Sequence, residues 1–367
     1  MVRLQRRCGA LAALTWLLAA CAAPAAPAAA PAAPPAAAVA SPTGAALAAP
    51  PVPIKVRQGL VGSLGDGPIL IALDRGYFAE VGLDVEDNRF DAATRMMQPL
   101  AAGQLDVVSA ALTAGLFNAF ARDIDVRVVG DRGVESKGHG YNAIVARQDL
   151  WESGAIRSLA DLRGRKVGAA GYQAGSLIAL QLGMALEAQG MRLDDLDLVD
   201  ITLPDTNAAL ANHTLDGAVQ IEPLVALGLA NNLFTVLMRS DEMSPDLQSA
   251  LILYAAGFAR DQRDAGRRWM TAYLRGVRDY VDAFTRDRGR DAVVESLARQ
   301  TTVKDPNVYR LIVPSYMNPN GYVNVETLVG AQDWFGSHGY IPQKVDIPAL
   351  VDRQFADYAV SVLGEYR

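Results

Sequence analysis

The residues of this chain that could bind a ligand gather in short loops behind strand-like segments. Hydroxyl, small and charged residues follow three such segments, at Ser63, Leu64, Gly65 and Asp66, then at Ser109 and Ala110, then at Arg132. Hydroxyls and free backbone N–H groups at strand ends bind anions or polar groups without many charged side chains. We therefore expect these loops to form one site for a small polar molecule.

Charged residues near the same loops could extend this site. Asp91, Thr94 and Arg95 open a predicted helix that follows the second strand. Arg95 and Arg132 could each add a charged hydrogen-bond donor. The competing interpretation, which is the more common situation, is a solvated arginine at a helix start or in a loop.

The second half of the chain offers a similar loop in front of a helix. Gly175 and Ser176 precede a predicted helix over residues 177–189. Small residues there let a ligand approach a helix N-terminus, and Ser176 could act as both cap and ligand contact. Tyr141 and Tyr172 could stack on a planar ring, and Asp205 lies at the start of the next predicted helix.

Glu222, which precedes Pro223, permits two interpretations. Its carboxylate could face the ligand and accept hydrogen bonds from an amine or a protonated ring, or it could be a hinge carboxylate held by backbone amides. Further acidic residues occupy the candidate loops, at Asp66, Asp91, Asp131 and Asp205. This mixture of charges favours a zwitterion or a heterocycle over a simple sulfonate.

The elements that must position these residues alternate between strands and helices. Residues 54–60 and 83–86 alternate apolar with polar side chains, as half-buried strands do. Between them, apolar residues recur at helical spacing up to Gly82, which suits a left-handed stop. Strand–helix–strand units of this kind build a parallel α/β sheet. We predict further strands at 105–108, 126–129, 197–203 and 251–258, and helices at 261–286, 324–338 and 348–363.

Several motifs carry a family resemblance. Residues 74–86, reading DRGYFAEVGLDVE, resemble the A-x-x-x-G-[FY]-F-x-x-x-G-L-x-V signature of solute-binding proteins that serve ABC importers. Residues 159–168 and 213–223 resemble two further elements of the branch that takes up taurine, alkanesulfonates, nitrate and thiamine-precursor pyrimidines. With the C-terminal helices, the resemblance covers residues 54–364.

The resemblance implies an α/β fold of the periplasmic-binding-protein type II (Venus-flytrap) class. Such a fold has two lobes, each a mainly parallel sheet flanked by helices, which two hinge crossings join around a cleft. We expect residues 54–148 and 230–367 to form lobe 1 and residues 149–229 to form lobe 2. The aromatic stripe of the 261–286 helix is interpreted as packing within lobe 1, not as a cofactor site.

The function implied is capture of a small-molecule ligand and its delivery to the membrane permease of an ABC importer, by a monomer without cofactor or metal. Two alternatives stay open: an enzyme of the thiamine-pyrimidine-synthase type on the same fold, or a ligand sensor. Such enzymes use clustered histidines and a cysteine-rich motif, whereas His139, His213 and His338 are scattered along this sequence.

The N-terminal residues are typical of an export signal. Three arginines precede a short apolar run that ends in Leu18-Ala-Ala-Cys21, which resembles a bacterial lipobox. We predict a signal peptide at residues 1–20 and a lipid anchor on Cys21, which would hold the exported protein at the outer face of the cell membrane or in the periplasm. The competing interpretation is an ordinary signal peptide cut near Ala22. Residues 21–53, rich in Ala and Pro, would form a disordered tether.

Composition excludes other classes of protein. The 367-residue chain has a formal net charge of −6 and no basic run beyond its leader, so we expect no nucleic-acid partner. No later stretch of 18 or more apolar residues occurs that could span a membrane. The chain also lacks the G-x-x-x-x-G-K-[ST] motif of a nucleotide-binding loop.

Overall fold

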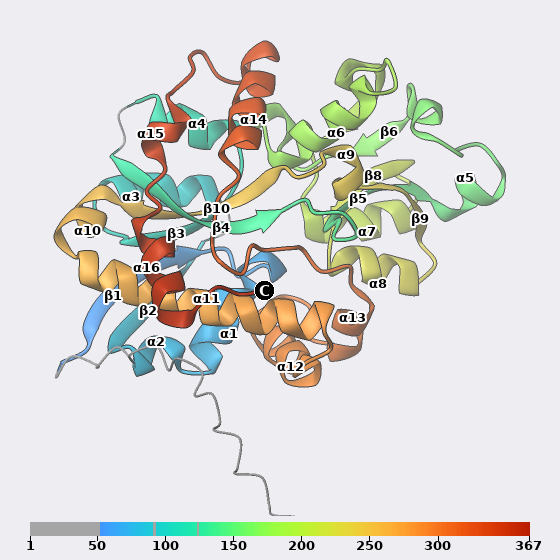
Figure 1. The fold of residues 1–367 in the computed structure, drawn as a ribbon. Coiled ribbons are helices and arrows are strands. Elements are labelled where there is room, and N and C mark those ends of the chain that lie inside the picture. The colour runs from blue at the N-terminus through green and yellow to red at the C-terminus, as the bar shows by residue number, and fades with distance from the viewer. Residues whose placement is uncertain (1–51, 91–92, 123–124) are drawn as a thin grey trace, which may run out of the picture. The chain divides into compact units, whose positions relative to one another are not determined.

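The strands of the chain form two five-stranded sheets in the computed structural model, which describes residues 52–90, 93–122 and 125–367 (Figure 1). The first sheet, the basis of lobe 1, has the order β2(Leu83–Arg89), β1(Ile54–Leu60), β3(Val107–Ala111), β10(Gln248–Ala255), β4(Val126–Val134). Strand β1 is parallel to β2 and β3, whereas β10 runs antiparallel to β3 and β4. Lobe 1 therefore has the mainly parallel sheet predicted.

The second sheet, the basis of lobe 2, repeats this arrangement. Its order is β7(Asp197–Val199), β6(Lys166–Gly168), β8(Gly217–Ile221), β5(Asn142–Arg147), β9(Phe234–Arg239). Strand β6 is parallel to β7 and β8, and β5 runs antiparallel to β8 and β9. In each lobe one antiparallel strand is thus inserted next to the edge strand.

The chain passes between the two sheets twice, as predicted. The first crossing lies in residues 135–141, between β4 and β5, and the second in residues 240–247, between β9 and β10. The lobe boundaries predicted at residues 148 and 230 therefore move by one strand each, because β5 and β9 pair within lobe 2. A short apolar strand does not reveal from its own residues which of two sheets it will join.

Helices surround both sheets. The α-helices are α1(Gly67–Asp74), α2(Tyr77–Glu80), α3(Met97–Ala101), α4(Ala114–Phe120), α5(Gln148–Glu152), α6(Leu177–Glu187), α7(Leu203–Ala211), α8(Leu224–Ala230), α9(Ser240–Met243), α10(Ala256–Asp261), α11(Arg263–Thr285), α12(Arg290–Gln300), α13(Pro306–Leu311), α14(Val325–Ser337), α15(Ile347–Leu350) and α16(Gln354–Leu363). Short 3₁₀ helices span η1(Leu64–Asp66), η2(Ala93–Met96), η3(Leu159–Leu162), η4(Tyr172–Ala174) and η5(Leu193–Asp195).

Three predicted elements are shorter or divided. The helix expected up to Gly82 ends at Asp74, because Gly76 adopts a left-handed conformation with φ of 71° and starts the separate helix α2. The strand expected at 197–203 ends at Val199, since α7 already begins at Leu203 with Pro204 in its first turn. The helix expected at 348–363 is divided into α15 and α16.

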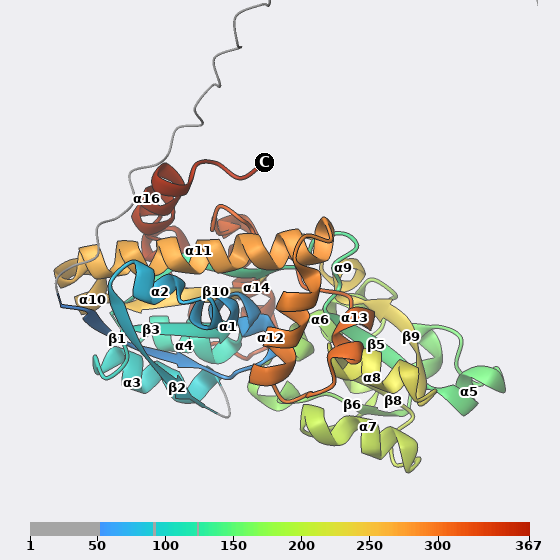
Figure 2. The same ribbon diagram turned by 90° about the horizontal axis from the view of Figure 1, so that it is seen from below.

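The long helix α11 supplies much of the core of lobe 1. It packs against α1, α2, α12 and α16 and runs along this lobe (Figure 2). Trp269 and Tyr273 are fully buried and stack with their ring centroids 5.3 Å apart, and Tyr254 of β10 meets Trp269 edge-on. The aromatic stripe of this helix is therefore lobe packing, as interpreted from the sequence.

Candidate ligand-binding cleft

A cavity of about 430 Å³ lies between the two lobes. Lobe 1 lines it with the loop after β1, with β3 and the end of β4, and with the start of β10. Lobe 2 lines it with the loop after β6, the starts of β5, α6 and α7, and the end of β8. Ligands of α/β proteins bind at such carboxyl ends of parallel strands. The volume falls within the range of small-molecule sites.

Six residues predicted from the sequence line this cavity, namely Ser63, Gly65, Ser109, Arg132, Tyr141 and Ser176. The lobe 1 members meet because β1, β3 and β4 lie in one sheet and end at the same edge. Several lining residues were not predicted: Thr113, Glu135, Asn142, Gly171, Ser249 and Ser315.

An ion pair forms the lobe 1 wall of the cavity. Arg132 Nη2 donates to Asp66 Oδ1 at 2.9 Å, and Arg132 Nε donates to Ser109 Oγ at 2.8 Å. The Asp66 side chain is fully buried and also accepts the N–H groups of Gly62 and Ser63. Burial alone would raise the pKa of Asp66, but Arg132 and the hydrogen bond from Ser109 hold that pKa below its ordinary value. The charge of Arg132 is therefore balanced within the protein.

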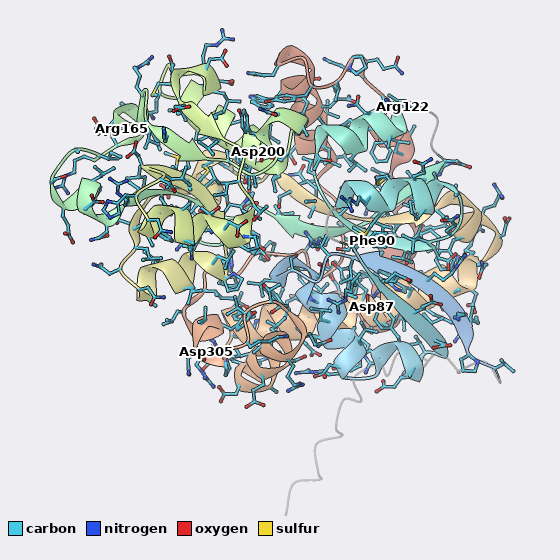
Figure 3. The ribbon with its side chains drawn as sticks, turned by 180° about the vertical axis from the view of Figure 1, so that it is seen from behind. Asp87, Phe90, Arg122, Arg165, Asp200 and Asp305 are labelled. Atoms are coloured by element: carbon cyan, nitrogen blue, oxygen red, sulfur yellow. The ribbon has the colours of Figure 1, made fainter. Side chains whose placement is uncertain are left out.

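A glycine-rich loop forms the lobe 2 wall. Ser176 caps α6, because its Oγ accepts the N–H of Ala179 at 3.2 Å, which confirms the predicted cap. Gly171 N donates to Asp200 Oδ1 at 2.8 Å. Asp200 is labelled in Figure 3. Gly175, with φ of 68°, accepts the N–H of Ala114 from lobe 1 at 2.8 Å. The two lobes thus touch at this loop.

The crossing segments close the cavity on a third side. Glu135 lies at the start of the first crossing and is 2% exposed, and Asn142 at the start of β5 is 1% exposed. Burial raises the pKa of Glu135 to about 7, although the Ser240 hydroxyl donates a hydrogen bond to it. In the sequence Glu135 looks like an ordinary acidic residue at a strand end, and its neighbours do not indicate that it lines a ligand site.

Two neutral hydroxyl groups complete the lining. Burial raises the pKa of Tyr141, so its phenol stays protonated at neutral pH. Ser315 belongs to the segment after α13, and its buried Oγ has no hydrogen-bond partner among the described residues. A chain segment more than 170 residues beyond Tyr141 therefore contributes to the same wall.

The remaining predicted residues lie elsewhere. Leu64 and Ala110 are buried beside the cavity without lining it. Tyr172 donates to Leu198 O at 3.3 Å, and Asp205 accepts from Thr202 Oγ1 on an exposed part of α7. Arg95 borders a separate surface hollow on α3, because the helix after β2 leads away from the cleft. Of Thr94 only the backbone is described, and Asp91 and Cys21 lie outside the described residues.

Of the two interpretations of Glu222, the structure shows the second, a carboxylate held by backbone amides. Its carboxylate accepts the N–H groups of Ala226 at 3.0 Å and Val313 at 3.1 Å, and Arg239 Nη1 lies at 3.2 Å. The side chain is buried and is absent from the cavity lining, although the preceding Ile221 belongs to it. Glu222 is thus placed as a carboxylate held by backbone amides near the crossings.

The three histidines lie apart from one another. His139 Nδ1 faces Pro314 O, and His213 lies 3.8 Å from Asp149. His338 Nε2 lies 2.7 Å from Glu187 of lobe 2. Within residues 52–90, 93–122 and 125–367, no group of three or more His, Cys, Asp or Glu side chains is placed to hold a metal ion, and no helix is long and apolar enough to cross a membrane.

The sequence matches one family model and is similar to curated proteins that are named as binding proteins. A family model described as "NMT1/THI5 like" matches residues 66–283. A protein of Brucella abortus (strain 2308) named as a candidate binding protein is 27% identical over 173 residues, which are 47% of this chain and 49% of that protein. The chain thus spans about half the length of the curated relatives it matches.

Solved structures of binding proteins share the fold. The alkanesulfonate-binding protein SsuA of Xanthomonas axonopodis pv. citri, bound to MOPS, has a TM-score of 0.65 at 18% identity, over 82% of this chain and 99% of that chain. The aliphatic sulphonate-binding SsuA of Escherichia coli has a TM-score of 0.66 at 21% identity, over 82% and 92%. The nitrate-binding NrtA of Synechocystis PCC 6803 reaches 0.69 at 13% identity, over 86% and 90%. The predicted type II binding-protein fold is confirmed.

Proposed function

The chain belongs to the NMT1/THI5-like family, and from that premise we propose that it is the substrate-binding protein of an ABC importer. It captures a small polar organic solute, a heterocycle, zwitterion or organic anion, and delivers it to the membrane permease. The observation that carries this proposal is the cavity of about 430 Å³ whose lining comes from both lobes. A solute that contacts both walls favours the state in which the lobes touch, and that state would dock on the permease.

We propose that the six predicted residues that line the cavity contribute to the ligand contacts. Ser63 and Ser109 offer hydroxyls from lobe 1, and the backbone around Ser176 offers the start of α6 from lobe 2. Polar groups at a helix start and at strand ends suit a solute with hydrogen-bond acceptors. The similar structures include an alkanesulfonate-binding and a nitrate-binding protein, which makes uptake of a small solute the activity most consistent with this fold.

We propose binding without catalysis, with a monomer as the functional unit. The cavity lining contains serine, threonine and tyrosine hydroxyls, and no histidine or cysteine belongs to its described part. A serine hydroxyl is a weak nucleophile unless a general base activates it. An enzyme of the thiamine-pyrimidine-synthase type is the alternative, and conversion of a bound solute, followed by NMR over hours, would establish that alternative.

We also propose that the protein is exported as a lipoprotein anchored through Cys21. The lipobox-like Leu18-Ala-Ala-Cys21 follows a basic and apolar leader. Metabolic labelling with radioactive palmitate tests this directly. The wild-type chain should carry the label and fractionate with membranes, and Cys21→Ser should lose both properties. Equal labelling of the two proteins would rule out the anchor.

Thermal unfolding of the purified chain against a solute panel tests the binding function. The panel holds aliphatic sulfonates, aminopyrimidines, flavins, nitrate, carboxylates and amines. A solute at about 100 times its Kd adds about 2.7 kcal/mol to the stability, which raises the Tm by several degrees. One chemical class that raises the Tm identifies a binding protein and its ligand chemistry. A panel without any shift would argue against solute capture and favour a sensor that responds to a different molecule.

A further inference from the structure

Glu135 is a buried carboxyl group at the point where both crossings meet the cavity. Its N–H donates to Leu247 O, and its carbonyl accepts from Asp246 N, each at 2.9 Å. The carboxylate accepts from Ser240 Oγ, and Ser249 stabilises its charged form with a further hydrogen bond. All these donors are neutral. Within the part of the chain that the structure describes, the carboxylate is therefore hydrogen-bonded but not paired with a positive charge.

Asn142 places a second acceptor on the same wall. Its N–H donates to Ser240 Oγ at 3.1 Å, and its Nδ2 donates to Gln181 Oε1. Its Oδ1 is buried and has no hydrogen-bond partner among the described residues. A buried acceptor without a donor costs about 1–3 kcal/mol, so a hydrogen bond from a ligand N–H to this oxygen would be favourable.

The charges of the lining distinguish between ligand classes. Arg132 is the one cationic side chain in the described lining, and Asp66 already neutralises it at 2.9 Å. An organic anion would find no unbalanced cation and would lie in the same cavity as Glu135. A buried charge without a partner is unfavourable, and an opposite charge from a ligand stabilises it.

The cavity also has an apolar part. Side chains of Val61, Leu177, Ile178, Leu203 and Ile221 line it from both lobes. These groups bury hydrocarbon and offer no hydrogen bonds, so they suit the body of a ligand whose polar group lies at the crossings. The cavity therefore combines acceptors at the crossings with a broad apolar surface contributed by both lobes.

We propose that the cleft takes an amine-bearing organic solute whose nitrogen donates to Glu135 and Asn142 while its apolar body packs on the aliphatic lining. This inference rests on the proposed binding function and narrows it to amines over organic anions. The hydrogen bonds from an ammonium group to a carboxylate are charge-assisted and stronger than those between neutral groups. Glu135 thus determines head-group specificity.

A matched series of probes tests the proposal. Hexyl and 2-phenylethyl compounds, each with an ammonium, hydroxyl, carboxylate or sulfonate head group, are titrated into the full chain by calorimetry at pH 8. The wild-type protein should bind the amines about tenfold or more tightly than the alcohols and anions. Glu135→Gln, which keeps the size and a hydrogen bond to Ser240, should lose that preference. Glu152→Gln removes one carboxylate from the exposed helix α5 and should retain it.

Each outcome decides the proposal. A preference for alcohols or anions, or an amine preference that survives Glu135→Gln, overturns the amine site and leaves solute binding intact. Absence of binding by all probes also overturns it, and the broader unfolding panel then decides the binding function separately. If Glu135→Gln does not fold, the head-group preference of the wild-type protein decides alone.

Discussion

Replacing Glu135 by glutamine should change how stability depends on pH. The carboxyl group is 2% exposed, and its burial raises its pKa from 4.5 to about 7. The neighbouring Asp241 carboxylate raises that pKa further, while the Ser240 hydroxyl opposes the shift. Glutamine keeps the shape of the protonated acid and cannot ionise, so the variant isolates the effect of the Glu135 charge.

The magnitude follows from the two pKa values. A folded pKa above the unfolded value means that the folded state binds more protons between them, so the stability contributed by the protonated acid is present below pH 4.5 and is lost as pH rises through 7. At about 1.4 kcal/mol per pKa unit, the full loss is about 3 kcal/mol. Between pH 5 and pH 8 the loss is about 2.5 kcal/mol.

Urea denaturation of both proteins at pH 5, 6, 7 and 8 measures this loss. The free energy of unfolding of Glu135→Gln, minus that of the wild type, should rise by about 2.5 kcal/mol over this range. Asp131, whose pKa burial also raises, to about 6, titrates in both proteins and cancels in the difference. A difference that stays constant with pH would refute the reasoning, because it would mean that Glu135 ionises as easily in the folded state as in the unfolded chain.

Three further variants test the cleft. Asp66→Ala leaves the guanidinium of Arg132 buried without its partner and should destabilise the fold by about 3–5 kcal/mol in urea denaturation; a loss below about 1 kcal/mol would contradict this. Gly175→Val forces a side chain into a left-handed backbone and places its Cβ 2.6 Å from that of Ala114, so a strain of about 1–3 kcal/mol should hold the lobes apart. Its radius of gyration, measured by small-angle scattering with a bound solute, should exceed that of the wild type, and equal values would show that the contact does not control closure. Ser176→Ala removes the cap of α6 and should cost about 1 kcal/mol of unfolding free energy; an unchanged value would mean that the cap is dispensable.

Local signals identified much of the architecture. Gly82 follows the end of its helix with φ of 75°, as only glycine does easily, and it was expected as a stop. The Ser176 cap and the alternation of strands and helices were also predicted from neighbouring residues alone. Since parallel strands end at one edge of a sheet, these signals also brought Ser63, Ser109 and Arg132 into one cavity.

The positions of other site residues depend on how their elements are oriented in the fold, and the neighbouring sequence does not indicate that orientation. Arg95 comes after β2 in the sequence, but it borders a separate surface hollow and not the cleft, so its position could not be predicted from spacing. Glu222 could have faced the ligand, and only the packing of α8 against α13 placed the amides of Ala226 and Val313 on its carboxylate. The lobe boundaries moved for a similar reason, because strand pairing is a contact between distant segments.

By itself the sequence determined the α/β class, which follows from periodicity and glycine positions, and part of the hydroxyl lining, which follows from strand ends. The family resemblance implied the two lobes. Tertiary structure alone decided the charge of the site. The positive charge of Arg132 was balanced when a residue 66 positions away paired with it, and Glu135 was removed from solvent when both crossings and α6 packed around it. Electrostatic free energy depends on distance and burial. Both quantities are set by residues that are far apart in the sequence.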